Sequence, residues 1–151
     1  MADGKERPIH ENHRARMQER VAHNGMESLA DHEVLYIILM DDSCHPLYDL
    51  KAAEGVPNHV SIDTRKLLRD VLRSNASTAI LAHNHPTGPA LPSATDQLTT
   101  LKIMQLLAPA GISILDHIIV AGENACSMAD RGRLPDISAH PGILNAASTD
   151  F

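Results

Sequence analysis

Aromatic side chains are almost absent from this sequence of 151 residues. It contains no tryptophan, one phenylalanine at the last position, and two tyrosines, Tyr36 and Tyr48. Proteins that bind single-stranded nucleic acid usually stack several bases on aromatic rings, so this composition argues against such a platform. It also predicts a core made of leucine, isoleucine, valine, alanine and methionine.

Positive charge is scarce as well, because 13 lysines and arginines stand against 19 aspartates and glutamates, a formal net charge of −6. No overall field draws such a protein to a polyphosphate backbone, so direct nucleic-acid binding is not supported. Segment 11–25 carries a local basic face that includes Arg14, Arg16 and Arg20. We interpret it as a solvated or partner-facing helix, with phosphate contact as the alternative.

Cysteine is limited to Cys44 and Cys126, and neither has a second ligand at metal-binding spacing. Two cysteines cannot build a disulfide framework, so we expect reduced thiols in a cytoplasmic protein. No apolar run approaches the roughly 18 residues of a membrane span, and residues 1–8 lack a signal-peptide core. We therefore expect no membrane contact, and nothing in the sequence specifies an oligomeric state.

The order of apolar runs and helix signals predicts an α/β fold with a single mixed β-sheet and flanking helices. The uninterrupted run over residues 34–40 predicts a strand buried on both faces, although a short buried helix leading into it would look similar. Further strands are expected from residue 47 and over residues 59–62, 77–82, 112–120 and 125–128. Helices are expected over residues 11–25, 64–73 and 93–108, the second of them capped by Asp63.

The candidate metal-ligating residues begin where the predicted strand over residues 77–82 is followed by two histidines, His83 and His85. Side chains of a strand repeat with a period of two, so both imidazoles can reach one cation. A rigid turn with three prolines follows, and Asp96, in the first turn of the next helix, can face back across it. Two imidazoles and a carboxylate with an open fourth position are the ligand set of a hydrolytic zinc site.

Each of these features also has a purely structural interpretation. His-x-His pairs are common on surface strands, and Ser93-x-x-Asp96 fits a capping box at the start of a helix. The two roles of Ser93 are compatible, because a residue can cap a helix while its hydroxyl lines a pocket. His117, inside an apolar run, is either a core histidine or an imidazole that supports the ligands from behind.

His83-x-His85-Pro86 followed by Ser93-x-x-Asp96 resembles the JAMM signature of the JAB/MPN zinc metallo-isopeptidases, and the neighbouring segments are similar to the RadC branch. The segments that carry this second likeness are 60–62, 79–88 and 115–120. The resemblance implies a JAB/MPN, cytidine-deaminase-like architecture with Zn²⁺ on His83, His85 and Asp96. It further implies that Ser93 helps to hold the oxyanion and that His117 and Asp116 support the site.

The resemblance also divides the chain. We expect an N-terminal helical region over residues 1–32, similar to the start of RadC, and the JAB/MPN metal-binding domain over residues 33–134. The composition of residues 135–151 predicts a loosely packed or mobile tail. The helix-hairpin-helix segment that follows the N-terminal region in RadC is missing, since residues 35–40 already behave as a strand of the catalytic domain.

JAMM hydrolases also use a glutamate as the general base, and RadC relatives carry acidic residues just before a Gly-Thr turn. Counted back from Gly55, those places are not acidic in this sequence. Glu54 is the nearest carboxylate, and a β-bulge could turn it toward the metal, so we take it as the candidate base. A solvated turn residue is the alternative for Glu54, and Asp49 and Glu33 are the other candidate acids.

The resemblance therefore implies a zinc-dependent hydrolase in which water attacks an amide or isopeptide carbonyl of a peptide or protein substrate. The alternative is a catalytically weak or inactive RadC-like metal-binding module that acts through a DNA-repair or mobile-element partner. A general base is usually worth about 10²–10⁴ in rate, so the two hypotheses differ in whether a carboxylate reaches the attacking water.

Overall fold

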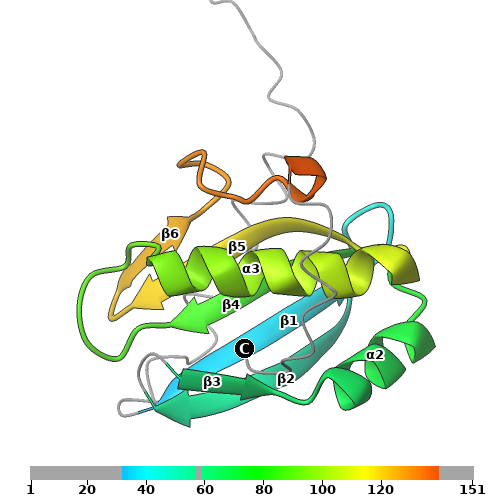
Figure 1. Ribbon diagram of the computed structural model, residues 1–151, viewed down its shortest axis with the longest axis horizontal. Coiled ribbons are helices and arrows are strands. Elements are labelled where there is room, and N and C mark those ends of the chain that lie inside the picture. The colour runs from blue at the N-terminus through cyan, green and yellow to red at the C-terminus, as the bar shows by residue number, and fades with distance from the viewer. Residues whose placement is uncertain (1–31, 57–58, 140–151) are drawn as a thin grey trace, which may run out of the picture.

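The computed structural model describes residues 32–56 and 59–139, and this part of the chain forms one six-stranded sheet with helices packed against it (Figure 1). The sheet order is β3-β2-β1-β4-β5-β6. The elements are β1 (Glu33–Met40), β2 (Pro46–Val56), β3 (His59–Ile62), α2 (Thr64–Arg73), β4 (Thr78–Asn84), α3 (Ala94–Leu107), the 3₁₀ turn η2 (Ala108–Ala110), β5 (Ser113–Ala121), β6 (Asn124–Ser127) and the 3₁₀ turn η3 (Ile137–Ala139). Because β4 and β5 are parallel and the other neighbours antiparallel, the predicted single mixed sheet is confirmed.

The central strand β1 confirms the prediction from the apolar run over residues 34–40. Every residue of β1 is buried except Tyr36, which is half-buried. The strand lies between β2 and β4, where both of its edges are hydrogen-bonded and both faces are covered. Residues 33–40 are extended throughout, and the alternative of a helix leading into this run falls on residues outside those that the structure describes.

The second strand is longer than the sequence predicts. Residues 55–58 have the composition of a turn, but β2 continues through Gly55 to Val56. Gly55 is paired with Glu33 of β1 and with Val60 of β3, and these ladders outweigh the low strand preference of glycine. The predicted strand over residues 59–62 is β3, with the same bounds.

Within the described residues, α2 and α3 begin at the caps expected from the sequence. Asp63 accepts a hydrogen bond from the backbone N–H of Lys66 and caps α2, and Ser93 caps α3. Not every leucine of these helices is buried, because Leu72 of α2 and Leu98 of α3 are exposed. In α3 the side that faces the sheet is centred on Thr100, Ile103 and Leu107, which leaves Leu98 beyond its margin.

Helices α2 and α3 lie on the same face of the sheet (Figure 1). They enclose one apolar cluster with β1 and β4; its members include Leu35, Ile37, Leu39, Leu67, Val71, Leu81, Ile103 and Leu107. A second cluster, on the other face, joins β1, β4 and β5; it contains Ile38, Met40, Cys44, Ile80, Ala82, Ile118 and Val120. The core is therefore aliphatic, as the scarcity of aromatic residues predicts.

Some predictions fall on residues that the structure does not describe. The helix expected over residues 11–25 lies outside the described residues, as does the end of the tail beyond residue 139. The division of the chain at residues 32 and 134 therefore stays a prediction. No helix among the described residues is both long enough and apolar enough to cross a membrane.

The connection from β4 through α3 to β5 creates the place where the polar residues meet. β4 ends and α3 begins at the same edge of the sheet, and the antiparallel neighbour β1 starts there too, since Leu35 is paired with His83. In sheets with parallel strands, ligands bind beyond the carboxyl ends of those strands. Here the end of β4 and the first residues of β1 and α3 lie at the same end of the strands.

Candidate metal centre

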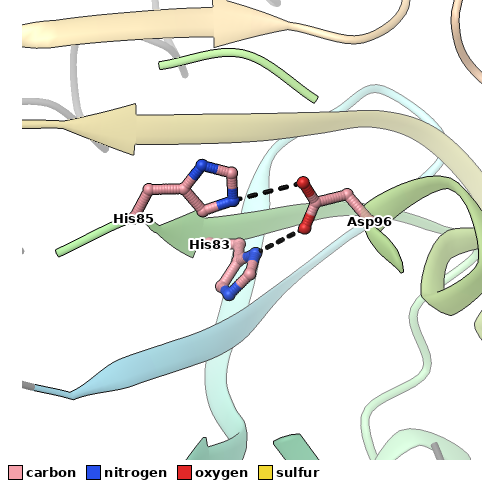
Figure 2. Close-up of side chains that lie close together, drawn as sticks. All are labelled: His83, His85 and Asp96. Carbon is pink, nitrogen blue, oxygen red and sulfur yellow. Dashed lines mark hydrogen bonds and ion pairs between the residues drawn. The ribbon is translucent and has the colours of Figure 1, made fainter. Parts of the chain in front are cut away.

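His83, His85 and Asp96 come together at this edge, as their spacing predicts (Figure 2). Asp96 lies between the two rings: its Oδ1 is 2.9 Å from Nδ1 of His83, and its Oδ2 is 3.2 Å from Nε2 of His85. One ligand atom from each of the three residues lies within 4.8 Å of the others. These three residues, named here the ligand group, could hold a metal ion.

The carboxylate of Asp96 is held in place by the start of its own helix. Oδ2 of Asp96 accepts a hydrogen bond of 2.7 Å from the backbone N–H of Ser93, and the Ser93 hydroxyl accepts one of 3.1 Å from the N–H of Asp96. This is the capping box that the sequence suggests. One carboxylate therefore serves both interpretations: it completes the cap and it faces the two histidines.

The electrostatics of the ligand group keep Asp96 ionised. Burial raises the pKa of Asp96, but hydrogen bonds from His83, His85 and Ser93 outweigh burial and hold that pKa well below its usual range. The bond to Asp96 in turn raises the pKa of His85. A metal ion would compete with protons for these nitrogen atoms, because a histidine must be neutral to act as a ligand.

A fourth polar side chain reaches the ligand group from β1. The carboxylate of Glu33 is buried, and its Oε2 lies 3.2 Å from Nε2 of His83. Residues directly opposite in an antiparallel pair share a face, so Leu35 and His83 point the same way, and Glu33, two residues earlier in β1, does too. Glu33 was only a distant candidate in the sequence, because 50 residues separate it from His83.

Glu54 and Asp49, the other candidate acids, lie on the opposite face of the sheet. Glu54 is paired with Val34, whose side chain alternates with that of Glu33, and Asp49 is paired with Ile38. The expected β-bulge is present, since Ala52 is skipped in the pairing of β1 with β2, but it does not turn Glu54 toward His83.

The surroundings of Glu54 are those of a solvated residue. Its side chain is 45% exposed and forms an ion pair of 2.7 Å with Nζ of Lys51. The hydrogen bond from Lys51 lowers the pKa of Glu54. The structure therefore does not bring Glu54 to the ligand group, and Glu33 occupies the position that Glu54 was expected to take.

His117 lies behind the ligand group as a buried, neutral imidazole. Its ring centroid is 6.0 Å from that of His83, and its Nδ1 is 2.6 Å from Oγ1 of Thr100. The Thr100 hydroxyl donates to the backbone carbonyl of Asp96 at 2.6 Å, so Nδ1 of His117 must donate to Thr100. Burial, followed by the nearby charge of His83, lowers the pKa of His117 to about 3.

Thr100 is a supporting residue that the sequence interpretation missed. It joins His117 of β5 to the first turn of α3, which carries Asp96. Its signal is a hydroxyl one helical turn after Asp96, on the side of α3 that carries the apolar residues. Nε2 of His117, on the other side of the ring, has no hydrogen-bond partner among the described residues.

Asp116 is also buried, but its hydrogen-bond partners belong to β5, β6 and the following turn and not to the ligand group. Its Oδ2 accepts a hydrogen bond of 2.5 Å from the Ser127 hydroxyl, and its Oδ1 accepts from the backbone N–H groups of His117 and Ala129. Burial raises the pKa of Asp116. These bonds hold β5 to the turn that follows β6.

Comparison with known proteins shows the family to which this chain belongs. The family model of the RadC-like JAB domain matches residues 12–133, so this chain belongs to the RadC-like JAB domain family. The chain is also similar to the UPF0758 protein PSHAa2643 of Pseudoalteromonas translucida (strain TAC 125), with 40% identity over 100 residues. That match covers 66% of this chain and 45% of the relative, so the chain spans less than half of the relative's length.

Proposed function

We propose that this domain is a zinc-dependent hydrolase of the JAMM type that cleaves an amide or isopeptide bond in a peptide or protein substrate. The observation that carries the proposal is the convergence of Glu33 with the ligand group at one edge of the sheet. Two imidazoles and one carboxylate are donors that zinc accepts, usually with a fourth position left open. Zinc bound there would polarise a carbonyl oxygen and lower the pKa of a water molecule.

Glu33 is the proposed general base. Its carboxylate is buried next to the ligand group, with Oε2 3.2 Å from Nε2 of His83, while Nδ1 of the same ring faces Asp96. Glu33 accepts a proton from the attacking water and later delivers it to the leaving nitrogen, so a single acid serves both halves of the reaction. A buried carboxylate at this position favours an enzyme over a metal-binding module that acts only through a partner.

Ser93 is the proposed donor to the oxyanion. Its hydroxyl lies 2.7 Å from Oδ2 of Asp96, and a hydroxyl has only one proton to donate. When that proton turns to a developing oxyanion, Oδ2 of Asp96 keeps its bond to the backbone N–H of Ser93. Removal of one such donor typically lowers turnover by about 10²–10³, so Ser93→Ala should lose activity and keep zinc.

The decisive experiment compares Glu33→Gln with Glu54→Gln, two substitutions that remove one carboxylate from opposite faces of the sheet. Zinc-loaded proteins are assayed on a panel of peptides and isopeptide-linked protein conjugates, and zinc content is measured by elemental analysis. Glu33→Gln should keep the metal and lose about 10²–10⁴ in turnover, since it removes the general base. Glu54→Gln should keep both metal and turnover.

Two results would contradict the proposed hydrolase function. Full turnover in Glu33→Gln would remove Glu33 from the mechanism. A zinc-loaded wild type without turnover on any conjugate or peptide of the panel would favour the metal-binding module over the hydrolase.

A further inference from the structure

We infer that Asn84 is a positioning residue that holds Glu33 against His83, an inference that rests on the proposed role of Glu33. Asn84 stands between the two histidine ligands, and its side chain is buried. Its Oδ1 accepts a hydrogen bond of 2.6 Å from the backbone N–H of Val34, and its Nδ2 donates one of 2.9 Å to the carbonyl of His32. The two backbone groups that it binds flank Glu33 on either side.

The side chain of Asn84 continues the β1–β4 ladder by one step. The outermost backbone pair between these strands is Leu35 with His83, so Glu33 lies beyond the last paired residue of β4. A carboxamide carries the same donor and acceptor as a peptide group, and here both are used. Glu33 is paired with Gly55 on the β2 side, and strand ends fray where backbone groups have no partner, so the two bonds of Asn84 secure the β4 side of the backbone around Glu33.

The segment of residues 83–85 therefore reaches three elements. His83 and His85 contact Asp96 of α3 through their rings, and the backbone N–H of His85 donates to the carbonyl of Val120 in β5 at 2.7 Å. Asn84, whose side chain alternates with theirs, contacts β1. One short segment thus sets the ligand pair and the proposed base relative to each other.

Two substitutions of Asn84 remove these bonds to different extents, and a substitution of a second residue, Thr78, provides a matched control. Asn84→Ala removes both bonds, whereas Asn84→Asp keeps an acceptor for Val34 and loses the donor to His32. Thr78→Val is the control: Thr78 begins β4, and its hydroxyl donates at 2.9 Å to the carbonyl of Asp41, just past the far end of β1. That bond also joins β4 to the chain next to β1, but far from Glu33.

The first readout needs no activity and no metal. In ¹⁵N NMR spectra of the metal-free protein, we expect Asn84→Ala to move the Nε2 signal of His83 in the same direction as Glu33→Gln, because both variants take the carboxylate away from that nitrogen. Hydrogen exchange at the Val34 amide should accelerate by more than about tenfold. Asn84→Asp should show a smaller change in the His83 signal, and Thr78→Val none.

The second readout is the turnover of the zinc-loaded protein. Asn84→Ala should bind zinc at the wild-type ratio and lose about 10–100-fold in kcat, part of the contribution of a general base. In the Glu33→Gln background the same substitution should cost nothing further, because the two residues act on one group. Thr78→Val should keep wild-type kcat.

An unchanged His83 signal in Asn84→Ala, with faster exchange at Val34, would overturn the inference and leave Asn84 with a structural role only. If Asn84→Ala does not fold by circular dichroism, Asn84→Asp is judged by the same signal. A wild type without turnover, combined with the expected movement of the His83 signal, would reject the hydrolase and keep the positioning role.

Discussion

Asp96 and Asp116 are both buried carboxylates, with exposed fractions of 2% and 0%, but their surroundings differ. Asp96 faces two imidazole rings, and hydrogen bonds from these rings lower its pKa against the effect of burial. Asp116 faces a serine hydroxyl and two backbone N–H groups, and burial raises its pKa. Asp96 lies in the first turn of α3, and Asp116 lies in β5, hydrogen-bonded to the end of β6 and the turn that follows it.

The difference shows that burial alone does not make an acid part of a site. The partners of Asp116 are groups that cannot give up their protons at neutral pH, so its hydrogen bonds are permanent parts of the fold. The imidazole partners of Asp96 can exchange a proton for a metal ion, so the same ring nitrogens are able to serve two states. The hydrogen-bond partners of the carboxylate, rather than its burial, therefore distinguish a candidate metal site from a purely structural network.

The largest expected effect that separates the two acids concerns metal binding. Asp96→Asn removes a charged ligand and should lower the affinity for zinc by more than about 100-fold, beyond the loss typical of residues that only support a ligand. Asp116→Asn should keep about one zinc per chain. Elemental analysis after dialysis measures both variants. Equal zinc in the two variants would contradict the assignment of Asp96 as a ligand.

The next effect concerns the stability of the metal-free protein. Asp116→Ala leaves the Ser127 hydroxyl and two backbone N–H groups without their acceptor, which should lower the free energy of unfolding by about 2–4 kcal/mol. Asp96→Ala leaves the backbone N–H of Ser93 and the rings of His83 and His85 without their acceptor, and should cost a comparable amount in the metal-free protein. Urea denaturation of the metal-free variants measures both losses, and a loss below about 1 kcal/mol in Asp116→Ala would contradict the structural role of its hydrogen bonds.

A smaller effect is the response of stability to pH through His117. The pKa of His117 is about 3 in the folded protein and about 6.5 in an unfolded chain, so the unfolded chain binds more protons between these values. The free energy of unfolding should therefore fall as pH falls from about 6 to 4, by up to about 1.4 kcal/mol per unit from this residue. In His117→Asn, which keeps a donor toward Thr100, the slope should lose that contribution. An unchanged slope would mean that His117 is protonated in the folded protein.

The smallest expected effect is that of metal removal on the fold. The clusters on both faces of the sheet are apolar and do not include the ligand group, so the domain does not depend on a metal for its core. Chelation should leave the far-ultraviolet circular dichroism spectrum unchanged and abolish turnover. Unfolding on chelation would mean that the ligand group is a structural metal site, as in small metal-dependent domains.

Much of the fold and the three residues of the ligand group could be predicted, because the sequence patterns that indicate them are local. The apolar run of β1, the alternation of β3 and the cap at Asp63 each depend on residues close in sequence, and all three are confirmed. The same holds for the ligand group, since a period of two brings His83 and His85 to one face and a single turn separates them from Asp96. A local pattern of this kind does not depend on how the rest of the chain packs.

The sequence by itself determined an aliphatic α/β domain with a mixed sheet and a His-His-Asp group, because side-chain periodicity and helix capping act over a few residues. Only the tertiary structure decided which acid stands next to that group. The choice of Glu33 over Glu54 depends on the register of β1 against β2 and β4, which packing sets across 50 residues of chain. A shift of one residue exchanges the two faces of a strand, so no local pattern could have made that choice.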